Sequence, residues 1–180
     1  MKAFGNKWYR NNPWITSDSH FYHFNIVKFN NSDGSPLRPW DDYLEMTEEL
    51  ISNWNEVVKE DDQIIHLGDI AFGGAERFHQ LMPRLNGKKV LVMGNHDTRT
   101  IPEYLMYFED VRSLIEIPKK AVMSHVPLHE SQLRRFGKSI HGHLHSSKVR
   151  DSNGKTDDRY INVCVEQTNY YPIRLDDILE

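Results

Sequence analysis

The sequence contains almost no cysteine: Cys164 is the only one in 180 residues, so no disulfide can form within the chain. Small secreted scaffolds that depend on disulfides are therefore excluded. Long apolar runs are absent too, and stretches such as 90–93 fall far short of the roughly 20 residues that span a bilayer. The first fourteen residues contain no apolar segment, so we expect no signal peptide, no membrane association and a cytoplasmic protein.

An excess of basic residues is also missing. The 22 lysine and arginine residues are outnumbered by 26 aspartate and glutamate residues, which gives a formal net charge of −4. Proteins that bind long stretches of nucleic acid usually contain a basic domain, so we expect no extended nucleic-acid interface. A small phosphorylated substrate held at one site remains compatible with this charge. The oligomeric state cannot be read from the sequence.

The remaining composition is that of a globular domain. Hydrophobic residues make up 38% of the chain and charged residues 27%, which is unlike disordered or membrane proteins. A chain of this length fits one domain of about 100–200 residues, and we find no internal repeat or linker. We therefore expect a single domain over residues 1–180, with loops at 30–41 and 150–159, where asparagine, serine, glycine and proline are common.

The apolar pattern predicts alternating strands and helices in the first half of the chain. Short apolar runs predict strands at 14–17, 63–67 and 89–93, and a spacing near 3.6 residues predicts helices at 41–59 and 75–85. The second half is richer in strands, which we predict at 111–117, 121–124, 139–141 and 160–165. Alternation favours a parallel sheet with helices, and the later strands indicate a second, mixed sheet, so we expect an α/β fold.

Polar clusters follow several predicted strands, and histidine, with ten residues, is unusually common. Because ligands of open α/β sheets bind beyond the carboxyl ends of the strands, we expect these clusters to converge. Carboxylate, imidazole and amide groups suit Mn, Fe, Zn or Ni better than Ca. The set is too large for one tetrahedral ion and sufficient for two. The clusters are Asp18-Ser19-His20, Gly68-Asp69, Gly94-Asn95-His96-Asp97, Ser124-His125 and Gly142-His143-Leu144-His145.

In this order, the clusters resemble the motifs of the calcineurin-like metallophosphoesterase superfamily. The segment 162–166 also resembles the ending of small bacterial and phage-type members. The resemblance implies a four-layer αββα sandwich of two mixed β-sheets flanked by helices. It also implies two divalent metal ions, manganese first and iron, zinc or nickel as alternatives. The implied reaction is hydrolysis of a phosphodiester or phosphomonoester by metal-activated hydroxide. A small chain with no large cap domain should have an open cleft, which favours a small nucleotide-type substrate.

The resemblance also assigns roles to individual residues. His96 would face the substrate phosphate as a general acid or charge stabiliser and would not bind metal. The ligands that it implies are Asp18, His20 and His145 for one ion, Asn95, His125 and His143 for the other, and Asp69 as a bridge between the two. Further candidates for substrate contact are His23, Arg99 and His129.

One position departs from the family pattern. Many relatives carry an acidic residue three positions after the bridging aspartate, where it orients the catalytic histidine, whereas this chain has Phe72. A phenyl ring cannot accept a hydrogen bond in this way, so another group must orient His96, and Asp97 is a candidate. The same absence argues against a Ser/Thr phosphoprotein phosphatase.

Three further histidines outside these clusters receive structural interpretations. We expect His66 to be hydrogen-bonded in the core, His141 to support a metal ligand or to pack, and His79 to lie on a helix surface. Two alternatives to a small-molecule phosphoesterase stay open. One is a nuclease acting on longer nucleic acid, and the other is a catalytically silent scaffold that uses the same fold for protein interaction.

Overall fold

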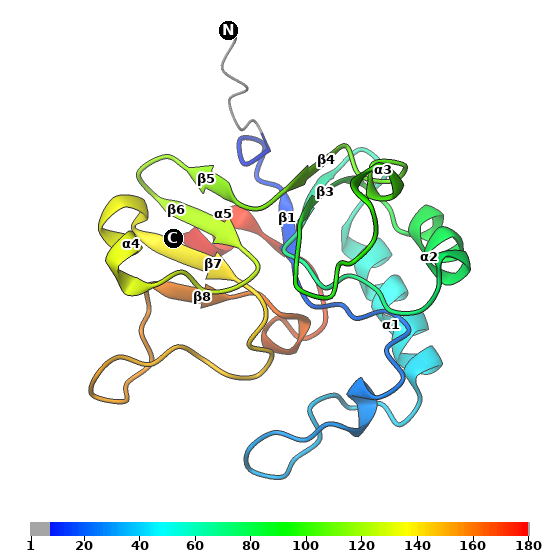
Figure 1. Ribbon diagram of the computed structural model, residues 1–180, viewed down its shortest axis with the longest axis horizontal. Helices are drawn as coiled ribbons and strands as arrows, with labels where there is room; N and C mark the ends of the chain where they lie inside the picture. Colours follow the sequence, from blue (N-terminus) through cyan, green and yellow to red (C-terminus); the bar gives the residue numbers. More distant parts are fainter. Residues whose placement is uncertain (1–7, 180) are drawn as a thin grey trace, which may run out of the picture.

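The computed structural model describes residues 8–179 and contains two β-sheets that face each other (Figure 1). The expectation about a signal peptide concerns in part residues 1–7, which lie outside the described residues. Within the described chain, no helix has the length and apolar character needed to cross a bilayer.

The first sheet has the strand order β4-β3-β2-β1-β9. Its first four strands pair in parallel, as the alternation of strands and helices predicts, and β9 pairs antiparallel with β1. The strands are β1 (Trp14–Thr16), β2 (Gln63–His66), β3 (Lys88–Val92), β4 (Asp110–Arg112) and β9 (Ile173–Arg174).

The second sheet is mixed and has the order β5-β6-β7-β8. The pair β5–β6 is an antiparallel hairpin, whereas β6–β7 and β7–β8 are parallel. Beyond the ends of β1 and β8, Ser17 and Cys164 form a parallel bridge, which joins the two sheets at this edge. The strands are β5 (Ile115–Ile117), β6 (Ala121–Ser124), β7 (Lys138–His141) and β8 (Tyr160–Asn162).

The strand predicted at 111–117 is wrong, because the chain changes sheet within it. β4 pairs with β3 in the first sheet, and β5, which begins three residues later, pairs with β6 in the second. Apolar periodicity within a short segment carries no information about which sheet the segment joins. The strand predicted at 160–165 is also too long, since β8 ends at Asn162 and a 3₁₀ turn follows at Val165–Gln167.

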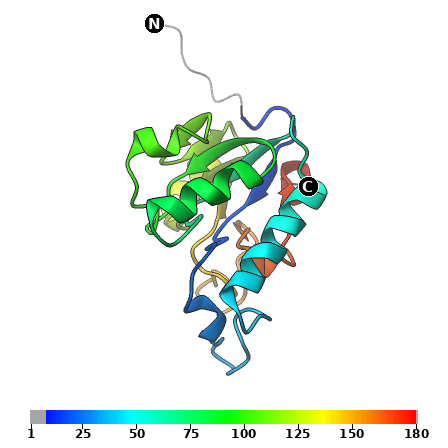
Figure 2. The same ribbon diagram turned by 90° about the vertical axis from the view of Figure 1, so that its right-hand side faces the viewer.

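Helices cover the outer face of the first sheet, where α1 (Tyr43–Val57) and α2 (Ala75–Leu81) lie on the same side (Figure 2). The Asp42 side chain caps α1 by accepting hydrogen bonds from two backbone amides of its first turn. α2 is shorter than predicted because Pro83 lies in a 3₁₀ turn at Met82–Arg84. The remaining helices are α3 (Ile101–Tyr104), α4 (Glu130–Phe136), which contacts β7, α5 (Leu175–Leu179) and a 3₁₀ turn at Ile26–Lys28.

The core consists of two apolar layers. Successive side chains of a strand point to opposite faces, so Ile64 of β2 packs towards α1 and α2, whereas Ile65 packs between the sheets. In β3, Leu91 likewise packs towards the helices, and Val90 packs between the sheets. The layers that the family resemblance implies are therefore present: helices, first sheet, second sheet, and α4 on the second sheet. Both predicted loops project from this body, each closed by an isolated antiparallel bridge (Figure 1).

Candidate metal centre

The predicted ligands converge from both sheets. Asp18 and His20 follow β1, Asp69 follows β2, Asn95 follows β3, and His125 follows β6. His143 and His145 come after β7. The structure collects six of these seven side chains into two groups whose ligand atoms lie within 4.8 Å of one another. The groups are Asp18 with His20 and His145, and Asp69 with His125 and His143.

In the first group, the Nε2 atom of His20 lies 3.6 Å from Oδ1 of Asp18. The His20 and His145 rings are stacked, with centroids 5.2 Å apart. Asp18 and His20, which follow β1, are almost completely buried. Two predicted ligands that follow the first sheet and one that follows the second therefore meet here, and His145 stays partly exposed.

In the second group, Nε2 of His125 lies 3.3 Å from Oδ2 of Asp69 and 3.2 Å from Nδ1 of His143. Oδ1 of Asn95, the seventh predicted ligand, lies 2.9 Å from the same His125 nitrogen. Ligand atoms bound at about 2.1 Å to one ion are separated by roughly 3.0–3.4 Å. The spacing of these four side chains is therefore that of a coordination shell.

Asp69 connects the two groups. Its Oδ2 atom lies 3.3 Å from Nε2 of His125 and 3.9 Å from Nε2 of His20, so one carboxylate oxygen reaches both. Its other oxygen, Oδ1, accepts a hydrogen bond from the backbone N–H of His96 at 2.8 Å. This geometry is what a bridging ligand requires.

Unpaired buried atoms show that the first group suits a metal ion. Among the residues that the structure describes, Oδ1 of Asp18 and both ring nitrogens of His20 are buried without a hydrogen-bond partner. Such atoms are costly unless something binds them. A divalent ion held by carboxylate and imidazole would satisfy them, so the residues present fit the group that the family implies.

Several ligands adopt a strained backbone conformation. Non-glycine residues with positive φ are uncommon, and they gather at functional sites where the surrounding structure holds them. Five of the seven predicted ligands have φ between 49° and 68°. Each of these left-handed turns directs a ligand side chain towards the two groups. The residues are Asp18, His20, Asp69, His143 and His145.

Gly142 is required by the close approach of the sheets. A Cβ atom at this position would collide with Oγ of Ser17 and Oδ2 of Asp18. The backbone can therefore pass directly beside the first group, and the N–H of His143 donates to Oδ2 of Asp18 at 2.8 Å. Only glycine allows this contact without displacing a ligand.

Neighbouring groups shift the pKa of two predicted ligands. Nδ1 of His125 donates to the Leu67 carbonyl at 2.8 Å, so Nε2 is the nitrogen that faces Asp69 and that would bind a metal ion. Burial alone would lower the pKa of His125, but its hydrogen bond with Asp69 and the charges of Asp18 and Asp69 raise it. Burial would likewise raise the pKa of Asp18, but the neighbouring His20 and His125 rings and the hydrogen bond from Ser17 hold it well below its usual range.

His96 lies beside these groups. Its side chain is exposed, and its ring centroid is 5.7 Å from that of His20 and 5.0 Å from that of Phe72. Asp97 has a different role from the one considered above. Its carboxylate accepts hydrogen bonds from the backbone amides of Asp69, Ile70 and Gly94. Asp97 therefore holds the turn that carries Asp69, and Phe72 packs against His96.

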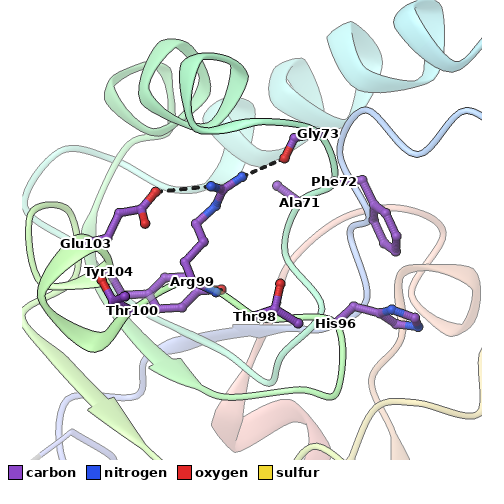
Figure 3. A pocket seen from close by; sticks show the side chains of 9 residues that line it. All are labelled: Ala71, Phe72, Gly73, His96, Thr98, Arg99, Thr100, Glu103 and Tyr104. Carbon is purple, nitrogen blue, oxygen red and sulfur yellow. Dashed lines mark hydrogen bonds and ion pairs between the residues drawn. The ribbon is translucent and has the colours of Figure 1, made fainter.

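A cavity of about 430 Å³ lies next to His96 (Figure 3). Arg99 lines this cavity, but its guanidinium donates to Glu103 at 3.1 Å and to the Gly73 carbonyl at 2.8 Å. It also stacks on Phe78, with 4.5 Å to the ring centroid. The guanidinium thus already contacts Glu103, Gly73 and Phe78, and a contact of Arg99 with substrate stays a prediction.

The other two substrate candidates lie in different surroundings. The His23 ring is 4.0 Å from Phe72 and 5.6 Å from His20, which places it at the rim of the first group. Burial and the charge of His20 lower the pKa of His23 to about 4, so its ring is neutral at pH 7. His129 caps the start of α4 and bonds to Ser131, and the structure does not place it in either ligand group.

The sequence analysis missed two residues behind the first group, Arg38 and Glu166. Glu166 accepts a hydrogen bond from Nδ1 of His145 at 3.0 Å and forms an ion pair with Arg38 at 2.8 Å. Burial would raise the pKa of Glu166, but the charge of Arg38 and the bond with His145 keep it low. The resemblance of 162–166 to family members was a signal for Glu166, whereas nothing in the sequence pointed to Arg38.

The remaining histidines form hydrogen bonds within the protein. Nε2 of His66 pairs with Oγ of Ser19 at 2.9 Å, and its Nδ1 accepts the Gly68 N–H at 3.2 Å, as expected of a hydrogen-bonded core residue. His141 is buried, and its Nδ1 donates to the Gly142 carbonyl beside the ligand loop. His79 lies half-buried on α2, where its Nδ1 pairs with the hydroxyl of Tyr107.

His66 gives the metal-free protein a pH-dependent stability. Burial lowers its pKa to about 3, although the Asp18 and Asp69 charges oppose the shift. The unfolded chain binds this proton below about pH 6.5 and the folded chain does not, so the free energy of unfolding falls as pH falls through this window. Between pH 7 and pH 5 we expect His66 to account for a loss on the order of 2 kcal/mol.

Urea unfolding with a chelator at pH 7 and pH 5 measures this contribution. The loss on acidification should be smaller in His66→Gln than in the unsubstituted protein. His79→Gln, which changes a half-buried histidine on α2, should leave the loss unchanged. Equal losses in all three proteins would show that His66 does not carry the effect.

Comparison with known proteins agrees with this fold. A model of the calcineurin-like phosphoesterase family matches residues 12–153. The uncharacterized protein MJ1445 of Methanocaldococcus jannaschii is 34% identical over 172 residues, covering 93% of this chain and 89% of that protein. The Gene 66 protein of Mycobacterium phage L5 is 31% identical over 171 residues, covering 77% of this chain and 79% of that protein.

A solved structure is similar over nearly the whole chain. The crystal structure of AQ665, a protein of unknown function from Aquifex aeolicus, has a TM-score of 0.62 and 27% identity, covering 92% of this chain and 96% of that one. The two facing sheets and the paired ligand groups define an α/β protein with two adjacent candidate sites for divalent metal ions. The chain belongs to the calcineurin-like phosphoesterase family, which confirms the resemblance and supports a metal-dependent phosphoester hydrolase.

Proposed function

We propose that the protein is a two-metal phosphoesterase that hydrolyses a small phosphodiester or phosphomonoester, with a nucleotide-type substrate favoured. The observation that carries the proposal is the position of Asp69, whose Oδ2 reaches both ligand groups while its Oδ1 holds the backbone of His96. Divalent ions bound there would polarise the phosphoryl oxygens and make a water molecule nucleophilic at neutral pH. Manganese is the first ion to test, with iron, zinc and nickel as alternatives.

The charge of the ligand set favours an anionic substrate. Only Asp18 and Asp69 among the seven predicted ligands are negatively charged, and the others are imidazole or amide groups. Two divalent ions would therefore leave the site net positive, although the whole chain has a net charge of −4. The attraction is local, which agrees with a small phosphorylated substrate better than with extended nucleic acid.

His96 supplies the remaining chemistry. Its imidazole is exposed next to the two groups and takes part in neither of them. It can donate a proton to the leaving oxygen or stabilise the charge that develops there. Asn95 and His143 are exposed as well, so a phosphate can approach the centre from solvent on this side.

Hydrolysis of two aryl phosphates, one a monoester and one a diester, tests the proposal. Metal-stripped protein is supplied in turn with Mn²⁺, Ni²⁺, Zn²⁺ and Fe²⁺, and the metal bound per chain is measured in parallel. We expect metal-dependent turnover and about two ions per chain, and the faster substrate identifies the ester class. No turnover and no bound metal would instead support a catalytically silent scaffold.

A further inference from the structure

We propose that the buried pair of Arg38 and Glu166 is a positioning device for the first ligand group alone, so that its loss weakens metal binding at one site and leaves the other unchanged. The inference rests on the proposed two-metal function. It concerns residues that do not contact the ions themselves.

Arg38 is an unusual residue for the interior. It comes from the loop between the first 3₁₀ turn and α1, yet its side chain is completely buried. Its Nε and Nη2 atoms both lie 2.8 Å from Oε1 of Glu166, whose side chain is 3% exposed. Buried charges need a partner and further hydrogen bonds. Two ionised side chains have been brought together here from positions 128 residues apart.

The remaining donors of Arg38 act on the first ligand turn. Nη2 donates to the carbonyl of Asp18 at 2.6 Å, and Nη1 donates to the carbonyl of Ser19 at 2.9 Å. Asp18 and His20 both have positive φ, at 56° and 49°. Such a conformation persists only where its surroundings hold it. The guanidinium therefore secures the backbone that directs these two ligands.

Glu166 acts on the third member of the same group. Its Oε1 accepts a hydrogen bond from Nδ1 of His145 at 3.0 Å. The proton is then on Nδ1, and the lone pair of Nε2 is available for a metal ion. One buried ion pair thus supports Asp18, His20 and His145, which come from two different sheets.

Apart from the hydrogen bond from the His143 N–H to Asp18, the second group is supported by other residues. Nδ1 of His125 donates to the Leu67 carbonyl, and the turn at Asp69 is held by Asp97. Among the described residues, no hydrogen bond of Arg38 or Glu166 reaches Asp69, His125 or His143. Removing the pair should therefore weaken one site, whereas a general loss of folding would weaken both.

Calorimetric titration of the metal-stripped protein with Mn²⁺ tests this selectivity. The unsubstituted protein should bind two equivalents. Arg38→Met and Glu166→Ala should each bind one equivalent with unchanged affinity, and the second should bind about 10–100-fold more weakly. Glu166→Gln retains a carbonyl that accepts from His145 and Arg38, so it should recover part of the lost affinity.

A matched control distinguishes this effect from the loss of any ion pair. Arg84 and Glu48 form an exposed pair, and Arg84→Met should bind two equivalents with unchanged affinity. Circular dichroism of each metal-free variant checks the fold. If Glu166→Ala does not fold, the test uses Glu166→Gln, because glutamine has nearly the same size as glutamate.

The possible outcomes separate the inference from the proposed function. Two equivalents with unchanged affinity in folded Arg38→Met and Glu166→Ala would overturn the inference and leave the two-metal function intact. Equal weakening of both sites in folded variants would also overturn it. Fewer than two equivalents in the unsubstituted protein would overturn the two-metal proposal and, with it, the inference.

Discussion

Asp69→Asn should bind neither metal ion tightly and should lose at least about a thousandfold in the rate of phosphoester hydrolysis. The reason is the shared oxygen: Oδ2 of Asp69 lies within 3.9 Å of His20 and 3.3 Å of His125, so both groups depend on it. An asparagine side chain supplies a neutral oxygen and halves the negative charge of the ligand set. A loss of about 4 kcal/mol in transition-state stabilisation corresponds to this rate change.

Metal content and thermal unfolding measure the first part of this prediction. In the unsubstituted protein, an ion that binds only the folded state adds about 2.7 kcal/mol of stability at a hundredfold excess over its Kd. Asp69→Asn should show little of this stabilisation by Mn²⁺, while its metal-free form stays folded. Asp61→Asn, which changes an exposed aspartate paired with Lys88, is a suitable control and should behave like the unsubstituted protein. Full metal content in Asp69→Asn would contradict the bridging role.

His96→Ala should lose about 10²–10⁴-fold in kcat while its metal content remains at the unsubstituted level. General acid catalysis by a positioned side chain contributes an effect of this size. The His96 ring lies outside both ligand groups, and its backbone N–H donates a hydrogen bond to Oδ1 of Asp69. The substitution keeps that N–H, so we expect the metal centre to remain intact.

The dependence on the leaving group shows what His96 does. An aryl leaving group needs little protonation, so the loss in His96→Ala should be smaller for aryl esters than for alkyl esters if His96 is a general acid. An equal loss for both ester types would favour charge stabilisation. His79→Ala, on α2, is the control and should keep full activity. Loss of metal together with activity would instead make His96 part of the metal centre.

Much of the metal centre was predictable because its residues are encoded in short segments. Pairs such as Asp18 with His20, and His143 with His145, are close in sequence, and each segment follows a strand. The rule that ligands gather at the carboxyl ends of strands then suffices to bring them together. The helix α1 was predictable for a similar reason, since its apolar spacing and the cap at Asp42 are local.

Other features were beyond the reach of local patterns. Whether β4 and β5 form one strand or two depends on which sheet each joins, and this is decided by contacts far along the chain. The function of Asp97 was equally hidden, because its partners are backbone amides of residues near position 70. A motif shows which side chain is present but gives no information about the atoms it faces.

The sequence by itself determined the α/β class, because strand and helix periodicity is local, and the order of its motifs carried the family resemblance that implied the layers and the seven predicted ligands. Only the tertiary structure decided that Arg38 and Glu166, 128 residues apart, form a buried pair behind one of the two ligand groups. It also showed that Asp69 shares one oxygen between the groups. The physical reason is that burial and charge pairing depend on distances in space, which the folded chain sets across both sheets at once.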